Sequence, residues 1–382
     1  MLCGAVRAET ALVLPFFNHS KSENLDWIGE SIAEAVQDSL ASQGVLVLSR
    51  EDRLEAYRRQ SLRPGAEITI ASIIKVGESL DASRVIYGNF EMIPAPEGSP
   101  SRGSLKLTAR ILDLKHTHQS PEFSEMGALE DLAVIQARLG WQVLKLLAPE
   151  TAPPEAEFLA ERPPVRVDAV ENYVRGLLAA SPEQRQHLFM QAARLDEHYS
   201  QPCFQLGKGF WEKKDFKMAA TWLARVARSD QHYLEAQFFL GLSRYREGDY
   251  AGAEAAFQIV AAAVPLNEVY NDLGAAQARR NNFTGAIASF QKALDGDSGD
   301  PDYHFNLGYA LWRSGQAAAA AESFRAAQER NAADTEASSM LGRALRGDGS
   351  HIADPRMDER LRLKTNYEEA AYRQLQAELK KK

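Results

Sequence analysis

The histidines that come closest to a metal-binding pattern are His116 and His118, which stand two residues apart. Alternate residues of a β-strand share a face, so both imidazoles could bind one metal ion. A zinc site needs three or four ligands, and no third ligand is evident in the sequence. We therefore interpret the pair as a solvated strand end and predict neither a metal nor another cofactor.

Carboxylates and glycines of the same region do not form a catalytic pattern either. Asp26 and Glu30 are spaced like a pair on one helix face, but acids in the first turn interact favourably with the helix dipole. No glycine cluster has the GxGxxG or GxxxxGK[ST] spacing of a phosphate-binding loop. The sequence therefore predicts a protein that is not an enzyme.

Composition excludes several classes of partner and site. The 382 residues carry a formal net charge of −8, whereas binding to phosphate groups of nucleic acid needs a basic face. Cys3 and Cys203 are too few for a disulfide framework. No run of about 18 apolar residues predicts a transmembrane helix.

Residues 1–9 carry a small-residue pattern, Val6-x-Ala8, that is typical of a secretory cleavage site. The apolar stretch that precedes such a site is missing. We expect this segment to be a signal-peptide remnant of an exported protein. The alternative is a disordered start on a cytosolic protein.

Residues 10–148 are predicted to form a small α/β domain. Short apolar runs at 11–16 and 45–48 flank an amphipathic helix over 25–40, which predicts a parallel strand pair with a right-handed crossover. Period-two alternation over 105–113 predicts an antiparallel strand, so the sheet is mixed. The other expected elements are helices at 50–60, 68–80 and 129–147 and a strand at 85–91.

Five short motifs of this domain occur in an order and spacing that resemble a known family. They are Val13-Leu14-Pro15-Phe16, residues 27–32 (WIGESI), residues 82–88 (ASRVIYG), Ala109-x-Ile111-x-Asp113, and residues 132–136 (LAVIQ). The domain is similar to the N-terminal domain of the TolB family and its CsgG/FlgO-like relatives. This resemblance implies an α/β sandwich in the bacterial cell envelope and an association with envelope assembly proteins.

Residues 149–165 contain five prolines and few large apolar residues, which predicts a semi-rigid, extended linker.

A Leu-Gly pair then recurs every 33 or 34 residues, ending at Gly207, Gly241, Gly274, Gly308 and Gly342. An alanine follows four of these glycines after twelve residues, and a large apolar residue after sixteen: Ala219, Ala253, Ala286 and Ala320, then Leu223, Phe257, Phe290 and Phe324. A period near 34 with fixed small residues is typical of stacked helix–turn–helix units.

These positions resemble the tetratricopeptide repeat (TPR) family, which implies an all-α superhelical solenoid. We predict five to six units over residues 166–382. The first, at 167–199, is divergent, and the last is interrupted by an insertion and resumes at Tyr367. The whole chain is thus predicted to be a two-domain α+β protein.

The resemblance also implies that the first helix of each unit lines a concave groove, the usual peptide site of that family. The groove positions of this chain are Phe204, Lys208, Trp211, Phe238, Phe239, Tyr245, Asn271, Phe305, Asn306, Tyr309 and Trp312. Exposed aromatic side chains mark binding surfaces. Each ring could instead pack on a neighbouring repeat.

Acids begin the first helices and arginines end them: Glu235, Glu268, Asp302 and Glu336, then Arg246, Arg279 and Arg313. Both columns could contact an extended ligand, but the helix dipole explains them more simply. The family's clamp for acidic C-terminal tails has lysines where these acids stand, so we do not expect such a tail as the ligand.

The sequence predicts a non-enzymatic scaffold that binds a protein or peptide, and we expect it in the periplasm or cell envelope of a bacterium. Two alternatives stay open: a cytosolic regulatory scaffold, and a sensor that binds a small ligand or glycan at the strand ends of Leu14 and Leu48. Phe238→Ala with Phe305→Ala is expected to weaken partner capture without loss of helix. A bulky residue at Gly241 is expected to damage folding.

Overall fold

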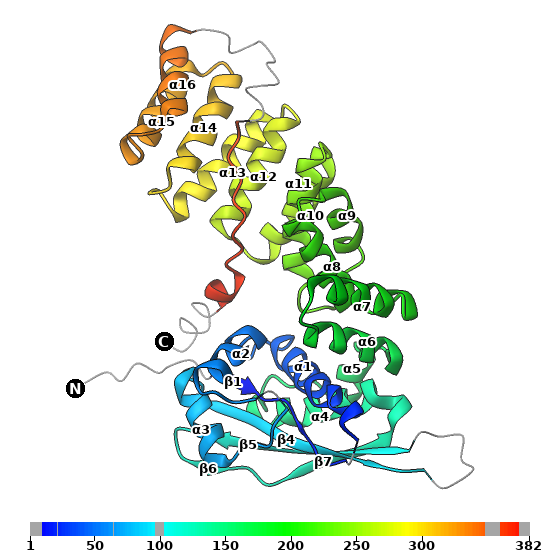
Figure 1. Ribbon diagram of the computed structural model, residues 1–382. Coiled ribbons are helices and arrows are strands. Elements are labelled where there is room, and N and C mark those ends of the chain that lie inside the picture. Colours follow the sequence, from blue (N-terminus) through cyan, green and yellow to red (C-terminus); the bar gives the residue numbers. More distant parts are fainter. Residues whose placement is uncertain (1–9, 21, 64, 96–102, 348–359, 374–382) are drawn as a thin grey trace, which may run out of the picture. The chain divides into compact units, whose positions relative to one another are not determined.

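A computed structural model describes residues 10–20, 22–63, 65–95, 103–347 and 360–373 (Figure 1). The expectations for residues 1–9 and for the polar end of the chain fall outside these ranges. The chain divides into two compact units. One contains Met1–Cys203, Ala227–Gln231 and the last ten residues; the other contains Phe204–Val226 and His232–Tyr372.

The first unit is built on a mixed sheet (Figure 1). Its strands are β1 (Thr10–Val13), β2 (Phe17–Asn18), β3 (Leu46–Val47), β4 (Arg84–Ile93), β5 (Ser104–Asp113), β6 (His118–Gln119) and β7 (Phe123–Ala128). Strand β1 lies between β3 and β4 and is parallel to both, whereas β5 is antiparallel to β4, β6 and β7. The predicted mixed sheet is confirmed. Strand β7 was not predicted, because its sequence FSEMGA has little apolar alternation.

Helices pack on this sheet through apolar side chains. They are α1 (Trp27–Ala41), α2 (Arg50–Arg59), α3 (Ile70–Ser79) and α4 (Leu132–Leu147). Leu12 and Leu14 pack with residues of α2 and α3 in one buried cluster, while α1 packs against α4. The guanidinium of Arg53 is buried, bonds Glu30, and donates to the Val13 carbonyl at 2.9 Å. This arginine therefore joins α2 to α1 and β1.

The proline-rich stretch is not simply extended. It contains α5 (Glu155–Ala160), whose Phe158 is completely buried beneath the Arg162 guanidinium, 3.7 Å from the ring centroid. Two glutamates in its first turn favour the helix start, and burial of Phe158 offsets the cost of ordering. The expectation of an extended spacer over residues 149–165 therefore misses this helix.

Pairs of helices follow in sequence: α6 (Val167–Leu178) with α7 (Pro182–Leu195), α8 (Ser200–Glu212) with α9 (Phe216–Leu223), α10 (Tyr233–Arg246) with α11 (Tyr250–Ala263), α12 (Asn267–Arg279) with α13 (Phe283–Gly296), and α14 (Pro301–Arg313) with α15 (Ala317–Arg330), before α16 (Thr335–Arg346). The stacked helical region is thus confirmed. Among the described residues, no helix has both the length and the apolar character needed to cross a membrane.

The recurring glycine and the large residue sixteen positions later form one contact. A Cβ atom on Gly241 would lie 2.6 Å from the Phe257 ring, and one on Gly308 would lie 2.9 Å from Phe324. Two helices can approach this closely only where one of them lacks a side chain. The periodic pattern of the sequence therefore encodes helix pairing.

Candidate functional site

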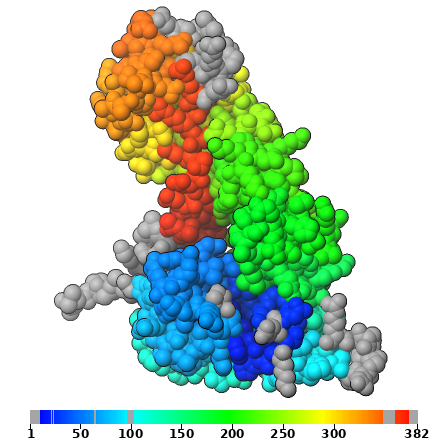
Figure 2. All heavy atoms as spheres, viewed as in Figure 1, coloured from blue at the N-terminus to red at the C-terminus, as the bar shows by residue number. Residues whose placement is uncertain are grey.

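Residues 361–368 lie, without helical or strand structure, along the first helices of the second unit (Figure 1). Helices α10, α12, α14 and α16 are neighbours and form one layer of the stack. Figure 2 shows the segment in red, seated in a hollow among these helices. We call residues 360–368 the tail segment and the surface that holds it the groove. A resumed repeat was expected at Tyr367; residues 361–368 are extended, and helical structure begins at Glu369.

Two buried asparagines bind the backbone of the tail segment. Asn306 accepts a hydrogen bond from the Arg362 amide (2.9 Å) and donates one to the Arg362 carbonyl (2.8 Å). Asn271, one repeat earlier, donates to the same carbonyl at 2.8 Å. Asn306 also donates to the Asn271 side chain, so each amide orients the other. Because these contacts involve main-chain atoms, they do not depend on the ligand's side chains.

Carboxylates bind the side chain of Arg362. Asp334 accepts from both terminal nitrogens, at 2.6 and 2.9 Å, and Asp302 accepts at 3.1 Å. The guanidinium also lies 3.8 Å from the ring centroid of Phe305, which is completely buried. A planar cation between a paired carboxylate and an aromatic ring is a geometry that arginine fits and lysine does not.

Lys364, two residues further on, occupies a second acidic position. Its ammonium group lies 2.7 Å from carboxylate oxygens of Asp300 and of Asp302. Its backbone amide donates to Asp272 at 2.9 Å. Asp302 therefore contacts both cations of the tail segment.

An aromatic contact and one further backbone bond complete the site. The rings of Tyr367 and Phe238 are stacked with their centroids 5.0 Å apart. The Glu368 amide donates to Glu268 at 3.1 Å. The tail segment therefore contacts α10, α12, α14 and the start of α16.

The pKa values of the groove follow these contacts. The hydrogen bonds from Arg362 hold the pKa of Asp334 below its usual range. Burial lowers the pKa of Lys364, but hydrogen bonds to Asp300 and Asp302 outweigh burial and raise it. Burial raises the pKa of Asp272 well above its usual range. Asp334 and Lys364 are thus held in their charged forms, whereas Asp272 is held toward its neutral form.

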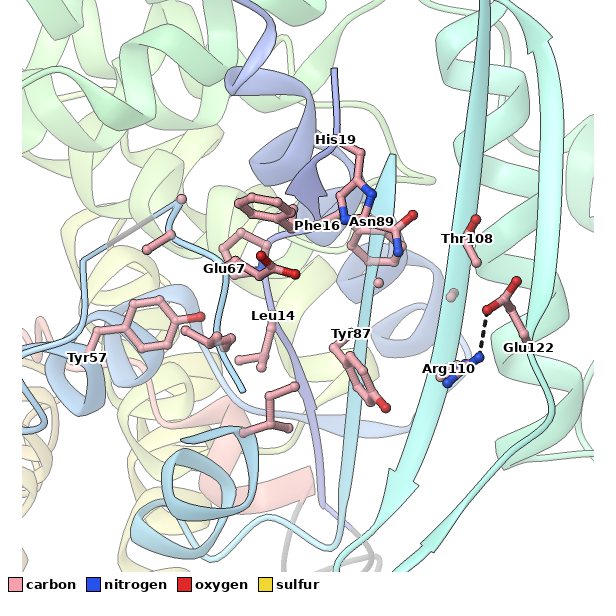
Figure 3. A pocket seen from close by; sticks show the side chains of 18 residues that line it. Leu14, Phe16, His19, Tyr57, Glu67, Tyr87, Asn89, Thr108, Arg110 and Glu122 are labelled. Carbon is pink, nitrogen blue, oxygen red and sulfur yellow. Dashed lines mark hydrogen bonds and ion pairs between the residues drawn. The ribbon is translucent and has the colours of Figure 1, made fainter. Parts of the chain in front are cut away.

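A separate cavity of about 250 Å³ lies in the first unit, at the carboxyl end of β1 (Figure 3). Leu14 and Phe16 line it, as do the polar side chains of His19, Glu67 and Asn89. Figure 3 also shows an ion pair at its rim between Arg110 and Glu122, which are 2.8 Å apart. The cavity stands at the predicted strand end of Leu14; Leu48 is not among its lining residues.

The histidine pair does not assemble a metal site in the structure. His116 Nδ1 lies 2.8 Å from Asp113, and His118 is in β6. Within the described part of the chain, no group of three histidine, cysteine or acidic side chains is placed to hold a metal ion.

Comparisons with known proteins bear on the stacked helices. A tetratricopeptide repeat family model matches residues 204–268, 240–301, 271–338 and 305–351. Residues 204–351 are therefore tetratricopeptide repeats. The matched residues do not include 10–148, so the likeness of that domain to the TolB family stays a prediction. Among curated proteins, none matches this chain.

Several solved structures resemble part of the chain. MamA from Desulfovibrio magneticus RS-1 is 26% identical, over 42% of this chain and 90% of that one, with a TM-score of 0.38. YrrB, described as a TPR protein with an unusual peptide-binding site, is 16% identical over 50% of this chain and 91% of its own, with a TM-score of 0.37. An O-GlcNAc transferase mutant of Thermobaculum terrenum is 29% identical over 34% of this chain and 24% of its own, with a TM-score of 0.29.

Four of the residues predicted to line the TPR groove contact the tail segment: Phe238, Asn271, Phe305 and Asn306. Others have partners within the repeats. Phe204 stacks on His232, Trp211 packs against Phe216 and Phe239, and Tyr245 packs against Tyr250. Lys208 pairs with Glu235 at 2.8 Å, and Tyr309 and Trp312 are almost completely buried.

The acids of the groove are the residues that sequence reasoning missed. For Asp302, Glu336 and Glu268 the helix-start explanation was preferred to contact with an extended ligand, yet all three contact the tail segment. Asp300 and Asp334 were not considered. A signal for them existed, because Arg360-x-Arg362-x-Lys364 places basic side chains at every second residue and Asp300 and Asp334 stand one repeat apart.

Proposed function

We propose that this TPR protein is a non-enzymatic scaffold whose groove binds an extended segment of a protein partner. The observation that supports this most is the pair of buried asparagines that bind both the amide and the carbonyl of Arg362. Such contacts would serve any extended chain. TPR repeats suggest protein interaction and are typically non-catalytic.

Photocrosslinking in the native host tests this proposal. Benzoylphenylalanine replaces Glu268, at the groove, in one chain and replaces Ile259, an exposed residue of α11, in a control chain. We expect partner proteins to crosslink from position 268 and not from position 259, as identified by mass spectrometry. Crosslinking only from position 259 would move the binding surface away from the groove.

We further propose a periplasmic location in the bacterial cell envelope and an association with envelope assembly proteins. The support is the resemblance of residues 10–148 to the TolB and CsgG/FlgO group, together with the Val6-x-Ala8 pattern. Fractionation of the host is the test. A native N-terminus at Glu9 in the envelope fraction agrees with the proposal, and an intact Met1 in the cytosol contradicts it and favours a cytosolic scaffold.

A sensor function through the first domain is the second candidate. The cavity at the end of β1 favours it, because apolar walls and a few polar groups are what small-ligand sites have in common. Ligand-observed NMR with sugars and small polar metabolites tests it. Binding that is lost in Asn89→Ala and retained in the exposed control Glu130→Ala would support the sensor function. If neither variant binds any of these compounds, the sensor function is rejected.

A further inference from the structure

We infer that the groove selects extended basic segments in which an arginine, a lysine two residues later and an aromatic residue three further on each have their own position. Residues 360–368 are a built-in occupant with this pattern, and a partner displaces them. This inference rests on the proposed scaffold function and adds the class of partner.

The charges of the groove are the first argument. Asp300, Asp302, Asp334 and Glu336 form ion pairs with three cationic side chains of the tail segment, those of Arg360, Arg362 and Lys364. Several carboxylates brought together and partly removed from water repel each other unless cations lie among them. An empty groove is therefore unfavourable, and a basic segment is the ligand that relieves the repulsion.

Spacing is the second argument. Alternate residues of an extended chain point to the same side, so an arginine and a lysine two residues apart both face the acids. The backbone hydrogen bonds at Arg362 and Lys364 set the register of the tail segment, and Tyr367 reaches the ring of Phe238 on α10. Acids at the starts of α14 and α16 thus bind the arginine and the lysine, and Phe238 of α10 binds the aromatic ring. The pattern Arg-x-Lys-x-x-aromatic follows from the order of these helices.

The nature of the contacts makes the tail segment displaceable. It is held mostly by ion pairs and hydrogen bonds whose charged groups remain partly exposed, at 19% for Arg362 and 22% for Lys364. Leu361 is its one buried apolar side chain among the described residues. Partly exposed ion pairs contribute little to stability, and segments with few buried apolar contacts open locally at low cost. Attachment to the same chain still supplies an effective concentration on the order of millimolar, so a free peptide competes poorly against it.

A competition experiment with the full chain tests the inference. The probe is a fluorescein-labelled peptide with the sequence of residues 360–370, RLRLKTNYEEA, followed by fluorescence anisotropy. The wild type is compared with Arg362→Glu/Lys364→Glu, in which the internal competitor is repelled. Arg325→Glu, an exposed charge reversal on α15, is the matched control.

We expect the double variant to bind the probe at least about tenfold more tightly than the wild type and the Arg325→Glu control, because the internal competitor is lost. Adding Asp302→Asn/Asp334→Asn to the double variant should abolish the gain, as should a probe with glutamate at both basic positions. Equal affinity for the wild type and the double variant, or no binding to a double variant with a wild-type circular dichroism spectrum, would overturn the inference.

If the double variant does not fold, amide hydrogen exchange of the wild type tests the same inference. Amides of Arg362 and Lys364 should exchange faster than those of α12 and α14, and excess unlabelled peptide should accelerate them further. If these amides exchange as slowly as those of the helices, the tail segment stays bound in the groove, which would contradict its displacement by a partner. A concentration-dependent dimer that exchanges the segment would overturn binding within one chain.

Failure of the inference can be told apart from failure of the scaffold function. If the double variant does not bind the labelled peptide more tightly but partners still crosslink from position 268, only the selectivity for basic segments is rejected. Absence of both would reject the groove as a binding site.

Discussion

Asp272 is the residue of the groove whose charge is least favourable. It is completely buried; its Oδ1 accepts hydrogen bonds from the Lys364 amide and from Asn271, while its buried Oδ2 has no hydrogen-bond partner among the described residues. Burial disfavours the charged form of a carboxylate, the more so when one of its oxygens has no hydrogen bond, which agrees with the raised pKa of Asp272.

Asp272→Asn is expected to raise the melting temperature at pH 7, because it removes this charge and preserves one acceptor oxygen. The unfolded aspartate loses its proton near pH 4, before the folded one does, so the cost in the wild type grows as pH rises above about 4. The gain in the variant should therefore be absent at pH 3 and present at pH 7. Thermal melts at both pH values measure it, and an equal gain at the two would refute this account.

Phe305 and Phe238 show why an aromatic residue in the groove is not a simple binding residue. Both side chains are completely buried, and each packs edge-on against the ring of the paired helix, Phe324 and Phe257. The expectation that both can be cut to alanine without loss of structure therefore does not fit their packing.

Phe305→Ala should lower the free energy of unfolding by about 3–5 kcal/mol, as for other large-to-small changes in a core. Urea denaturation followed by circular dichroism measures the change. Leu345→Ala, at a residue that is 64% exposed, is the control and should cost less than about 0.5 kcal/mol. A similar small cost for Phe305→Ala would place this ring in the groove surface after all.

Among the elements, the helix pairs depend on the glycine of each first helix. The contact between Gly241 and Phe257 leaves no room for a methyl group, whereas nothing lies within 4 Å of a Cβ atom on Gly209 in α8. The same chain thus offers a crowded and an open helical glycine.

Gly241→Ala should destabilise the repeats by about 1–3 kcal/mol because of overpacking. Gly209→Ala should stabilise by about 0.5–1 kcal/mol, since alanine loses less backbone entropy in a helix. Differential scanning calorimetry of both variants gives the comparison. Two shifts of the same sign would show that helix propensity, and not the close approach, governs these positions.

The helices of the repeats were the elements best predicted, and the reason is local. Their apolar residues recur at helical spacing, as Ala253, Phe257 and Val260 do, so each helix pair is visible within one period. Strand β7 and helix α5 have no such pattern. Strand β7 is stabilised by antiparallel pairing with β5, and α5 is stabilised by the burial of Phe158.

For the molecule as a whole, the net charge of −8 and the acids of the groove both attract a basic partner. Charges that attract a ligand over a distance accelerate association, and salt screens them.

Association of the 360–370 peptide with the Arg362→Glu/Lys364→Glu chain should therefore slow by about tenfold as salt rises from about 50 mM to about 500 mM. Stopped-flow anisotropy measures the rate constant. The dissociation rate should change less. An association rate that does not depend on salt would argue that the backbone and ring contacts alone recruit the peptide.

The sequence by itself determined the scaffold: the mixed sheet, the period of the repeats and the glycine positions that let helices pair. All of these depend on patterns within about 35 residues, the length of one unit. The tertiary structure alone decided what lies in the groove. Arg362 meets Asn306 and Asn271 across 56 and 91 residues of sequence, and contacts at that separation leave no periodic trace in a single chain. Charges that look like helix-end preferences became a binding site only when the fold placed the tail segment beside them.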